Sequence, residues 1–269
     1  MSSQTLRTVE VIAGFLLVWE AACRLFDLPT YFLPAPSLIL AEIWSEPRWY
    51  LAHCSYTLFT TALGFGLALL VGVIAAVGIT YSKLLENTLF TLLVSLNSVP
   101  KIALAPLFII WLGTGAKSKV AISFLIAIFA IVVDTVLGLR SADPGALDLM
   151  KTMRSSALQI LLKIRVPGAL PHMFAGMKVA ISLALVGAIA GEFVASQEGL
   201  GFVIMQSQGM FQTVRVFAAI LLRYGGAPGV SLARVPPARC NRARRAGVAD
   251  TSASCPSSAP LRVDNGEVA

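Results

Sequence analysis

Four polar side chains interrupt long apolar stretches of this sequence, and they are the residues best placed to do chemistry. They are Asn97, Lys101, Asp134 and Glu192. A charged side chain surrounded by hydrocarbon is costly, so such residues face the protein interior, pair with one another or line a wet path. We therefore predict an interior path. Two alternatives stay open: Asn97 and Lys101 could satisfy carbonyls freed at a proline kink, and Lys101 could pair with either acid.

No catalytic or metal-ligating pattern accompanies these residues. The two histidines, His53 and His172, stand in unrelated segments, and the four cysteines show no metal-ligand spacing. The stretch GTGAKS at 113–118 lacks the G-x-x-x-x-G-K-[ST] spacing of a phosphate-binding loop, and no strand is expected before it. We therefore predict a chain that is not an enzyme, with no catalytic residue, no metal, and no cofactor or ATP site of its own.

The elements that hold the four polar residues belong in a membrane. Of the 269 residues, 57% are hydrophobic and only 13% are charged, and the mean hydropathy of +0.78 is too high for an ordinary soluble domain. The net charge of +7 comes mainly from loops and from the last part of the chain. No basic face interleaved with aromatic residues is present, so nucleic acid is not an expected partner.

Five stretches have the roughly 20 apolar residues that a membrane-spanning helix needs. They are 8–26, 56–80, 88–112, 120–139 and 173–195. A sixth apolar run, 213–222, has about half the required length. The predicted fold class is all-α: an integral membrane bundle with five spans and a truncated sixth. Lysines and arginines between spans place the N-terminus and the loop 140–171 in the cytoplasm, although Lys117 and Lys119 oppose this trend.

Two spans carry patterns that predict specific contacts. In the first span, Glu20 precedes Arg24 by four residues, which favours an ion pair on one helix face. The second span has small residues at a strict spacing of four, which lets a neighbouring backbone approach closely, within one subunit or across a dimer. These small residues are Gly64, Ala68, Gly72 and Ala76.

The loop 140–171 is predicted to fold into two short helices, here called the elbow. Asp143 can cap a helix that begins with a proline. Ser156 and Gln159 have the spacing of a capping box, so a second helix is expected to start after Ser156 and to end at Pro167. This second helix sets an apolar stripe beside a basic one. Such an elbow is suited to docking on a partner.

The elbow resembles the cytoplasmic EAA loop of permease subunits of ATP-binding-cassette importers. The family pattern is E-A-A, three residues, glycine, nine residues and I-x-L-P. Here IRVP at 164–167 matches the end of the pattern, Arg154 stands at the glycine, and DLM at 148–150 stands at E-A-A. The stretches 98–115 and 168–204 resemble the branch that imports sulfonates, taurine, nitrate or vitamin precursors such as pyrimidines. The resemblance covers residues 8–222.

The resemblance implies a type I importer permease that carries a small solute across a bacterial inner membrane. ATP would be bound by a separate ATPase subunit, an extracytoplasmic binding protein would deliver the solute, and the permease would work as a homodimer. The elbow would be the coupling helix region in contact with the ATPase. The implied coupling residues are Asp148, Arg154, Leu158, Leu161, Leu162, Ile164 and Pro167. The implied translocation-path residues are Asn97, Lys101, Asp134 and Glu192.

The chain is predicted to divide after Leu222, into a permease domain at 1–222 and a tail at 223–269. The tail contains seven arginines and no lysine, and it is rich in alanine, proline, glycine and serine. Such a composition cannot bury a core, so we expect disorder. Because the change interrupts an apolar run, we interpret the tail as an out-of-frame reading. The alternative is a genuine basic tail that binds anionic membrane lipid.

Two other functions are compatible with the sequence. A secondary transporter would need a coupling-ion site in the membrane, for which Lys101, Asp134 and Glu192 are candidates, but paired broken helices in two halves are not evident. The chain could also be a truncated permease that fails to assemble, because its last apolar run is short.

Overall fold

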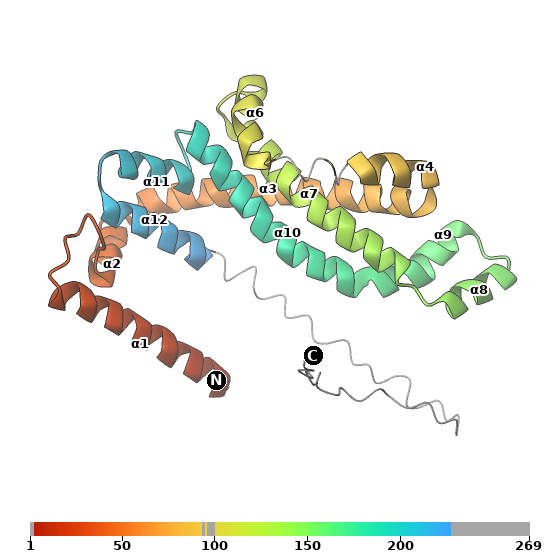
Figure 1. Ribbon diagram of the computed structural model, residues 1–269, viewed down its shortest axis with the longest axis horizontal. Coiled ribbons are helices and arrows are strands. Elements are labelled where there is room, and N and C mark those ends of the chain that lie inside the picture. Colours follow the sequence, from red (N-terminus) through yellow and green to blue (C-terminus); the bar gives the residue numbers. More distant parts are fainter. Residues whose placement is uncertain (1–2, 93–94, 96–99, 227–269) are drawn as a thin grey trace, which may run out of the picture. The chain divides into compact units, whose positions relative to one another are not determined.

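A computed structural model describes residues 3–92, 95 and 100–226 of the chain (Figure 1). Every regular element within these residues is helical, which confirms the predicted all-α class. Asn97 lies outside the described residues, as does the predicted tail from residue 227 onward.

Three long helices form the centre of the fold: α3 (Pro47–Tyr81), α7 (Ala116–Arg140) and α10 (Val166–Val194). Each packs against the other two, and Figure 1 shows α10 running beside α7. Among the described residues, these are the helices long and apolar enough to cross a membrane. They correspond to the predicted spans at 56–80, 120–139 and 173–195. The protein is therefore a multi-pass membrane chain.

The other two predicted spans have a different form. The first is helix α1 (Ser3–Leu25), which is not one of the three long apolar helices. In the described part of the stretch 88–112, a π-helix (η1, Glu86–Phe90) is followed by helical residues at 91, 92 and 95. A 3₁₀ turn (η2, Lys101–Leu104) and helix α6 (Ala105–Leu112) come after Pro100. Pro100 directly precedes η2 and a second proline lies in the first turn of α6, where neither donates a backbone N–H. The count of five spans and a truncated sixth stays a prediction.

Shorter helices cover one end of the bundle. Helix α2 (Pro36–Ser45), helix α11 (Leu200–Gly209) and helix α12 (Thr213–Gly226) pack together with the start of α3. Their shared core consists of Ile39, Tyr50, Leu200, Val203, Ala218 and Ala219. The short apolar run at 213–222 is therefore helical. At the opposite end of α3, the single turn α4 (Lys83–Leu85) follows Tyr81.

The small residues of α3 pack against α7 within one chain, as one of the two alternatives predicted. Gly64, Ala68, Gly72 and Ala76 are all buried. A Cβ atom at Gly64 would overlap the Ser123 side chain of α7. A Cβ atom at Gly187 of α10 would lie 2.9 Å from the Cα atom of the same serine. Position 123 is thus the point where α7 is held between two glycines.

The elbow's second helix does not end at Pro167, so that prediction is wrong. Helix α9 (Ala157–Ile160) continues through a π-helical turn (η3, Leu161–Arg165) directly into α10. Pro167 lies in the first turn of α10, where the preceding π turn changes the hydrogen-bond register and a missing N–H is tolerated. The apolar helix is therefore continuous from Ala157 to Val194.

Candidate functional site

The elbow consists of helix α8 (Pro144–Thr152) and helix α9, both capped as predicted. The Asp143 carboxylate accepts the Gly145 N–H at 3.1 Å. The Ser156 N–H donates to the Gln159 side chain at 2.9 Å, and the Gln159 N–H donates to the Ser156 hydroxyl at 3.3 Å. These bonds satisfy backbone donors at the start of each helix.

Arg154 closes helix α8 in a conformation that glycine usually adopts. Its φ is +52°, in the left-handed region. The Arg154 N–H donates to the Lys151 carbonyl at 2.9 Å, and the Ser155 N–H donates to the Met150 carbonyl at 3.0 Å. This pair of bonds defines a Schellman motif, whose left-handed position most often holds glycine. The glycine of the resembled pattern thus matches the backbone conformation at position 154.

Three contacts anchor the elbow to the ends of the long helices. The Tyr81 hydroxyl, at the end of α3, donates to the Ala157 carbonyl at 3.1 Å. The Arg165 guanidinium lies 5.5 Å from the centre of the Tyr81 ring and donates to the Leu139 carbonyl of α7 at 3.5 Å. A movement of the elbow must therefore displace α3, α7 and α10 or break these contacts.

The elbow presents large apolar side chains on its surface. Between 58% and 68% of the surface of each is exposed, and they are Leu149, Met153, Leu158 and Leu162. Leu161 and Ile164 are half-buried, and Asp148 forms an ion pair with Lys151 at 2.9 Å. Exposed apolar side chains on a capped, anchored element are typical of a docking surface.

At the other end of α10, Glu192 is fully enclosed, with 1% of its surface exposed. Its carboxylate accepts the Thr57 hydroxyl of α3 at 2.9 Å and the Gly201 N–H at 2.7 Å. Thr57 also accepts the Leu200 N–H at 2.8 Å. The carboxylate therefore ties the start of α11 to α3 and α10. Glu192 is interior as predicted, while its role in a path stays a prediction.

Two glycines make room for the Glu192 carboxylate. Gly199 has a φ of +103°, and a Cβ atom there would overlap the carboxyl group. A Cβ atom at Gly201 would lie 2.7 Å from the Glu192 Cβ. Any larger residue would push the loop between α10 and α11 away from the carboxylate.

A buried lysine lies close to this carboxylate, and the sequence did not reveal it. Lys119 is 0% exposed, and its ammonium donates to the carbonyls of Thr114 and Ala195, the latter at 2.7 Å. Gly191, the neighbour of Glu192, lies against it: a Cβ atom at Gly191 would be 3.4 Å from the Lys119 Cα. From the sequence, Lys119 was counted among the charges of a loop. In the structure it is buried inside the bundle, where its ammonium holds backbone carbonyls.

Among the described residues, the predicted path residues Lys101, Asp134 and Glu192 do not form one cluster. The Lys101 ammonium lies 5.1 Å from the centre of the Phe129 ring. Asp134 packs against Gly176, 16 residues before Glu192 in α10, which separates the two acids by about 24 Å along the helix. The Glu192 carboxylate has Thr57 and Gly201 as its hydrogen-bond partners. Asp134 and Glu192 are therefore too far apart to bind one coupling ion together.

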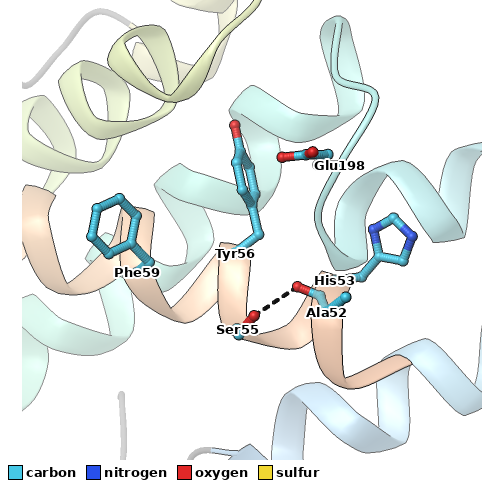
Figure 2. Close-up of a pocket in the computed structure, with 6 residues that line it drawn as sticks. All are labelled: Ala52, His53, Ser55, Tyr56, Phe59 and Glu198. Atoms are coloured by element: carbon cyan, nitrogen blue, oxygen red, sulfur yellow. Dashed lines mark hydrogen bonds between the residues drawn. The ribbon is translucent and has the colours of Figure 1, made fainter. Parts of the chain in front are cut away.

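A pocket of about 590 Å³ opens beside the Glu192 end of the bundle (Figure 2). Its lining residues are Ala52, His53, Ser55, Tyr56, Phe59 and Glu198. The Gly199 N–H donates to His53 Nδ1 at 3.1 Å, so the loop that encloses Glu192 also forms one wall of the pocket. These residues were not predicted, because five of them lie on α3 and only the fold brings Glu198 to them.

The chain resembles known proteins of one class. The family model for the binding-protein-dependent transport system inner membrane component matches residues 68–223, more than half of the chain. The chain is 33% identical over 222 residues to a probable ABC transporter permease protein of Haemophilus influenzae, covering 82% of this chain and 91% of the relative. It is 31% identical to the formylaminopyrimidine transport permease protein ThiX of Halalkalibacterium halodurans, with coverage of 82% and 88%.

A more distant relative and a solved structure extend the comparison. The taurine transport system permease protein TauC of Escherichia coli is 27% identical over 227 residues, covering 81% of this chain and 82% of the relative. The fold is similar to the inward-facing MetNI methionine ABC transporter, with a TM-score of 0.52 and 18% identity. That match covers 74% of this chain and 97% of the other.

Proposed function

The chain belongs to the family of binding-protein-dependent transport system inner membrane components, the permeases of ABC importers, and from this membership we propose how its parts work. The chain supplies the membrane path of an importer in a bacterial inner membrane. A separate ATPase subunit supplies the energy, and an extracytoplasmic binding protein delivers a small solute.

The exposed apolar surface of the elbow is the observation that carries the coupling role. Leu149, Met153, Leu158 and Leu162 offer apolar anchors, and both helices of the elbow are capped and therefore ordered. Burying such anchors in a groove of a partner is a strong source of affinity. We infer that the groove belongs to the ATPase subunit.

Coupling follows from the contacts that anchor the elbow. Closure of the ATPase pair on ATP would move the docked elbow as a rigid body. Because Tyr81 and Arg165 link the elbow to α3 and α7, and α9 continues into α10, all three long helices would tilt together. Such a tilt would alternate the path between inward-open and outward-open states.

We infer that the path forms between two copies of the chain. Within one chain, α3, α7 and α10 pack directly on one another through glycine and alanine. This close packing leaves no room for a solute between the three helices. A path for a solute then needs a second surface. A homodimer supplies it with the same surface from the partner.

The docking proposal is tested with Leu158→Asp and Leu162→Asp combined. Both side chains are exposed, so the chain should still fold, but docking would bury two carboxylates without partners, which costs several kcal/mol. We expect co-purification with the cognate ATPase to be lost. The readout is the amount of ATPase retained on the tagged permease, at an unchanged permease melting temperature.

A matched control places the same substitutions at the other end of the fold. Met210 and Phe211 are also exposed apolar neighbours, in the turn between α11 and α12. Met210→Asp combined with Phe211→Asp should leave ATPase binding intact. Full retention of the ATPase by the elbow variant would show that the elbow is not the docking site.

A further inference from the structure

We propose that the pocket lined by α3 and Glu198 is a solute subsite that selects a positively charged, amine-bearing aromatic ring over a sulfonate or another anion. The pocket residues are Ala52, His53, Ser55, Tyr56, Phe59 and Glu198. The inference rests on the proposed importer function and names the substrate class of that path.

The charge of the pocket comes from Glu198. The described residues that line it include neither lysine nor arginine. Within the part of the chain that the structure describes, no hydrogen bond or ion pair engages the Glu198 carboxylate. A carboxylate in this setting attracts a cation and repels an anion through the Coulomb interaction, which is strong over a few ångströms.

Two aromatic rings line the pocket, and the Tyr56 ring is the one beside the carboxylate. Tyr56 and Phe59 lie three residues apart on α3, so their side chains share one helix face. Figure 2 shows both rings projecting from the same side of α3, with the Glu198 carboxylate beside the Tyr56 ring. Aromatic faces attract cations and stack on planar rings. Carboxylate and rings together therefore favour a flat ligand that carries an amine.

His53 adds a neutral hydrogen-bonding group. Its Nδ1 accepts the Gly199 N–H at 3.1 Å, which requires a lone pair there and leaves the ring proton on Nε2. The ring also packs edge-on against Trp49, with 4.6 Å between ring centres, and this fixes its orientation. His53 thus offers a donor for a carbonyl oxygen or a ring nitrogen without adding positive charge.

The pocket lies where an incoming solute would arrive. Tyr56 precedes Tyr81 by 25 residues, so the pocket is about 37 Å along α3 from the elbow contact. With the elbow in the cytoplasm, this is the extracytoplasmic end. The Ser196 hydroxyl holds the Glu198 turn by donating to the Glu198 carbonyl at 2.6 Å and accepting the Glu198 N–H at 3.3 Å. The volume of about 590 Å³ suits a single small solute.

The test measures the charge preference of the pocket with thiol reagents of opposite charge. Ala52→Cys is introduced into the full chain, in lipid nanodiscs, after the four native cysteines are replaced by serine. We expect the ethylammonium methanethiosulfonate to label Cys at position 52 faster than the ethylsulfonate reagent, by a larger factor than separates the two reagents on free cysteine. Glu198→Gln should reduce this preference about fivefold, the size of a partly exposed ion pair.

The matched control is Asp27→Asn, which removes one negative charge from a carboxylate outside this pocket. Asp27 has a φ of 45°, a conformation that asparagine adopts equally well. The reagent preference should stay unchanged in this variant. A preference in the parent chain no larger than that on free cysteine, or an unchanged preference in Glu198→Gln, would overturn the subsite.

A second measurement addresses the ligand class. An aminomethyl-substituted aminopyrimidine should slow labelling at position 52, and Tyr56→Leu should weaken this protection about fivefold through loss of the cation–π contact. Taurine at the same concentration should not protect. Protection by taurine but not by the pyrimidine would contradict the proposal. The labelling experiment needs no ATPase, so it is independent of the docking experiment. A negative labelling result would contradict the subsite alone, and a negative docking result would contradict the coupling role alone.

Discussion

At the scale of single residues, Arg154 keeps a glycine conformation without being glycine. The Schellman motif at the end of α8 requires a positive φ at this position. A side chain in the left-handed region costs about 1 kcal/mol or more, because the Cβ atom crowds the following carbonyl. The elbow therefore carries local strain at the turn between its two helices.

Replacing Arg154 by glycine should stabilise the protein. Relief of the left-handed conformation outweighs the additional entropy of glycine in the unfolded chain, for a net gain of about 0.5–1 kcal/mol. The measurement is the thermal unfolding midpoint of the purified chain in detergent. Met153→Gly is the control, since Met153 has a φ of −75° and should be destabilised by glycine. A lower midpoint for Arg154→Gly would contradict this account.

The buried charges were predictable only in part. Glu192 stands inside a long apolar stretch, so its burial follows from sequence. Lys119 stands near the start of one, where a charge count treats it as part of a loop, and its acceptor at Ala195 is 76 residues away. Glu198 belongs to a short polar turn, and its place opposite Tyr56 and Phe59 depends on how α10 and α11 meet. Contacts of this range leave no local pattern in the sequence.

At the scale of elements, the contact of α3, α7 and α10 depends on missing side chains. Ser123 of α7 lies between Gly64 of α3 and Gly187 of α10, and its hydroxyl donates to the Ala184 carbonyl at 2.9 Å. Backbones that approach so closely gain dispersion contacts and a hydrogen bond that larger residues would prevent. The three long helices therefore behave as one packed unit.

Adding a single methyl group to this contact should disrupt it. A Cβ atom at Gly64 would overlap the Ser123 side chain and lie 3.0 Å from the Val120 carbonyl, whereas a Cβ atom at Gly66 meets nothing within 4 Å. We expect Gly64→Ala to destabilise the chain by roughly 1–3 kcal/mol. Gly66→Ala should be neutral or stabilising, since alanine is the better helix former. Thermal unfolding midpoints of both variants decide the matter, and equal midpoints would refute the close contact.

Short-range sequence patterns predicted where helices begin, but they did not predict where one helix ends or continues into the next. The caps at Asp143 and Ser156 depend on bonds within three residues, so spacing alone revealed them. The end at Pro167 was wrong because a π turn lets the helix continue through the proline. The stretch 88–112 has the composition of a span, yet its described part is divided next to Pro100. Proline effects depend on the surrounding hydrogen-bond register, which composition does not encode.

At the scale of the whole molecule, the long helices assign their flanking segments to two sides of a membrane. Helix α3 separates the segment before Pro47 from that after Tyr81, and α7 separates the 113–115 turn from the elbow. The burial of Lys119 removes one of the two lysines that opposed the predicted orientation. The remaining distribution of basic residues still predicts that the elbow lies in the cytoplasm.

Single cysteines in a cysteine-free chain should report this arrangement in intact cells. Lys117→Cys and Gln197→Cys should react with an impermeant maleimide from outside. Lys83→Cys and Met153→Cys should react only after the membrane is opened, because one helix crossing separates each group from the other. The cysteine-free parent serves as the blank. Labelling of positions 117 and 153 from the same side would show that α7 does not cross the membrane.

The unbroken helix from Ala157 to Val194 has a mechanical consequence. It is 38 residues long, or about 57 Å. It joins the elbow at one end to Glu192 and its hydrogen-bond partner Gly201 at the other. A rigid rod that is held near its middle works as a lever. Gly176, which packs against Asp134 of α7, lies near the middle of the rod. Gly187, which packs against Ser123, lies eleven residues further on, so α7 tilts together with α10 about a fulcrum near Gly176. A tilt of about 10° around this fulcrum would move each end by about 5 Å, in opposite directions. An inward push on the elbow would then swing the pocket wall at Glu198 the other way.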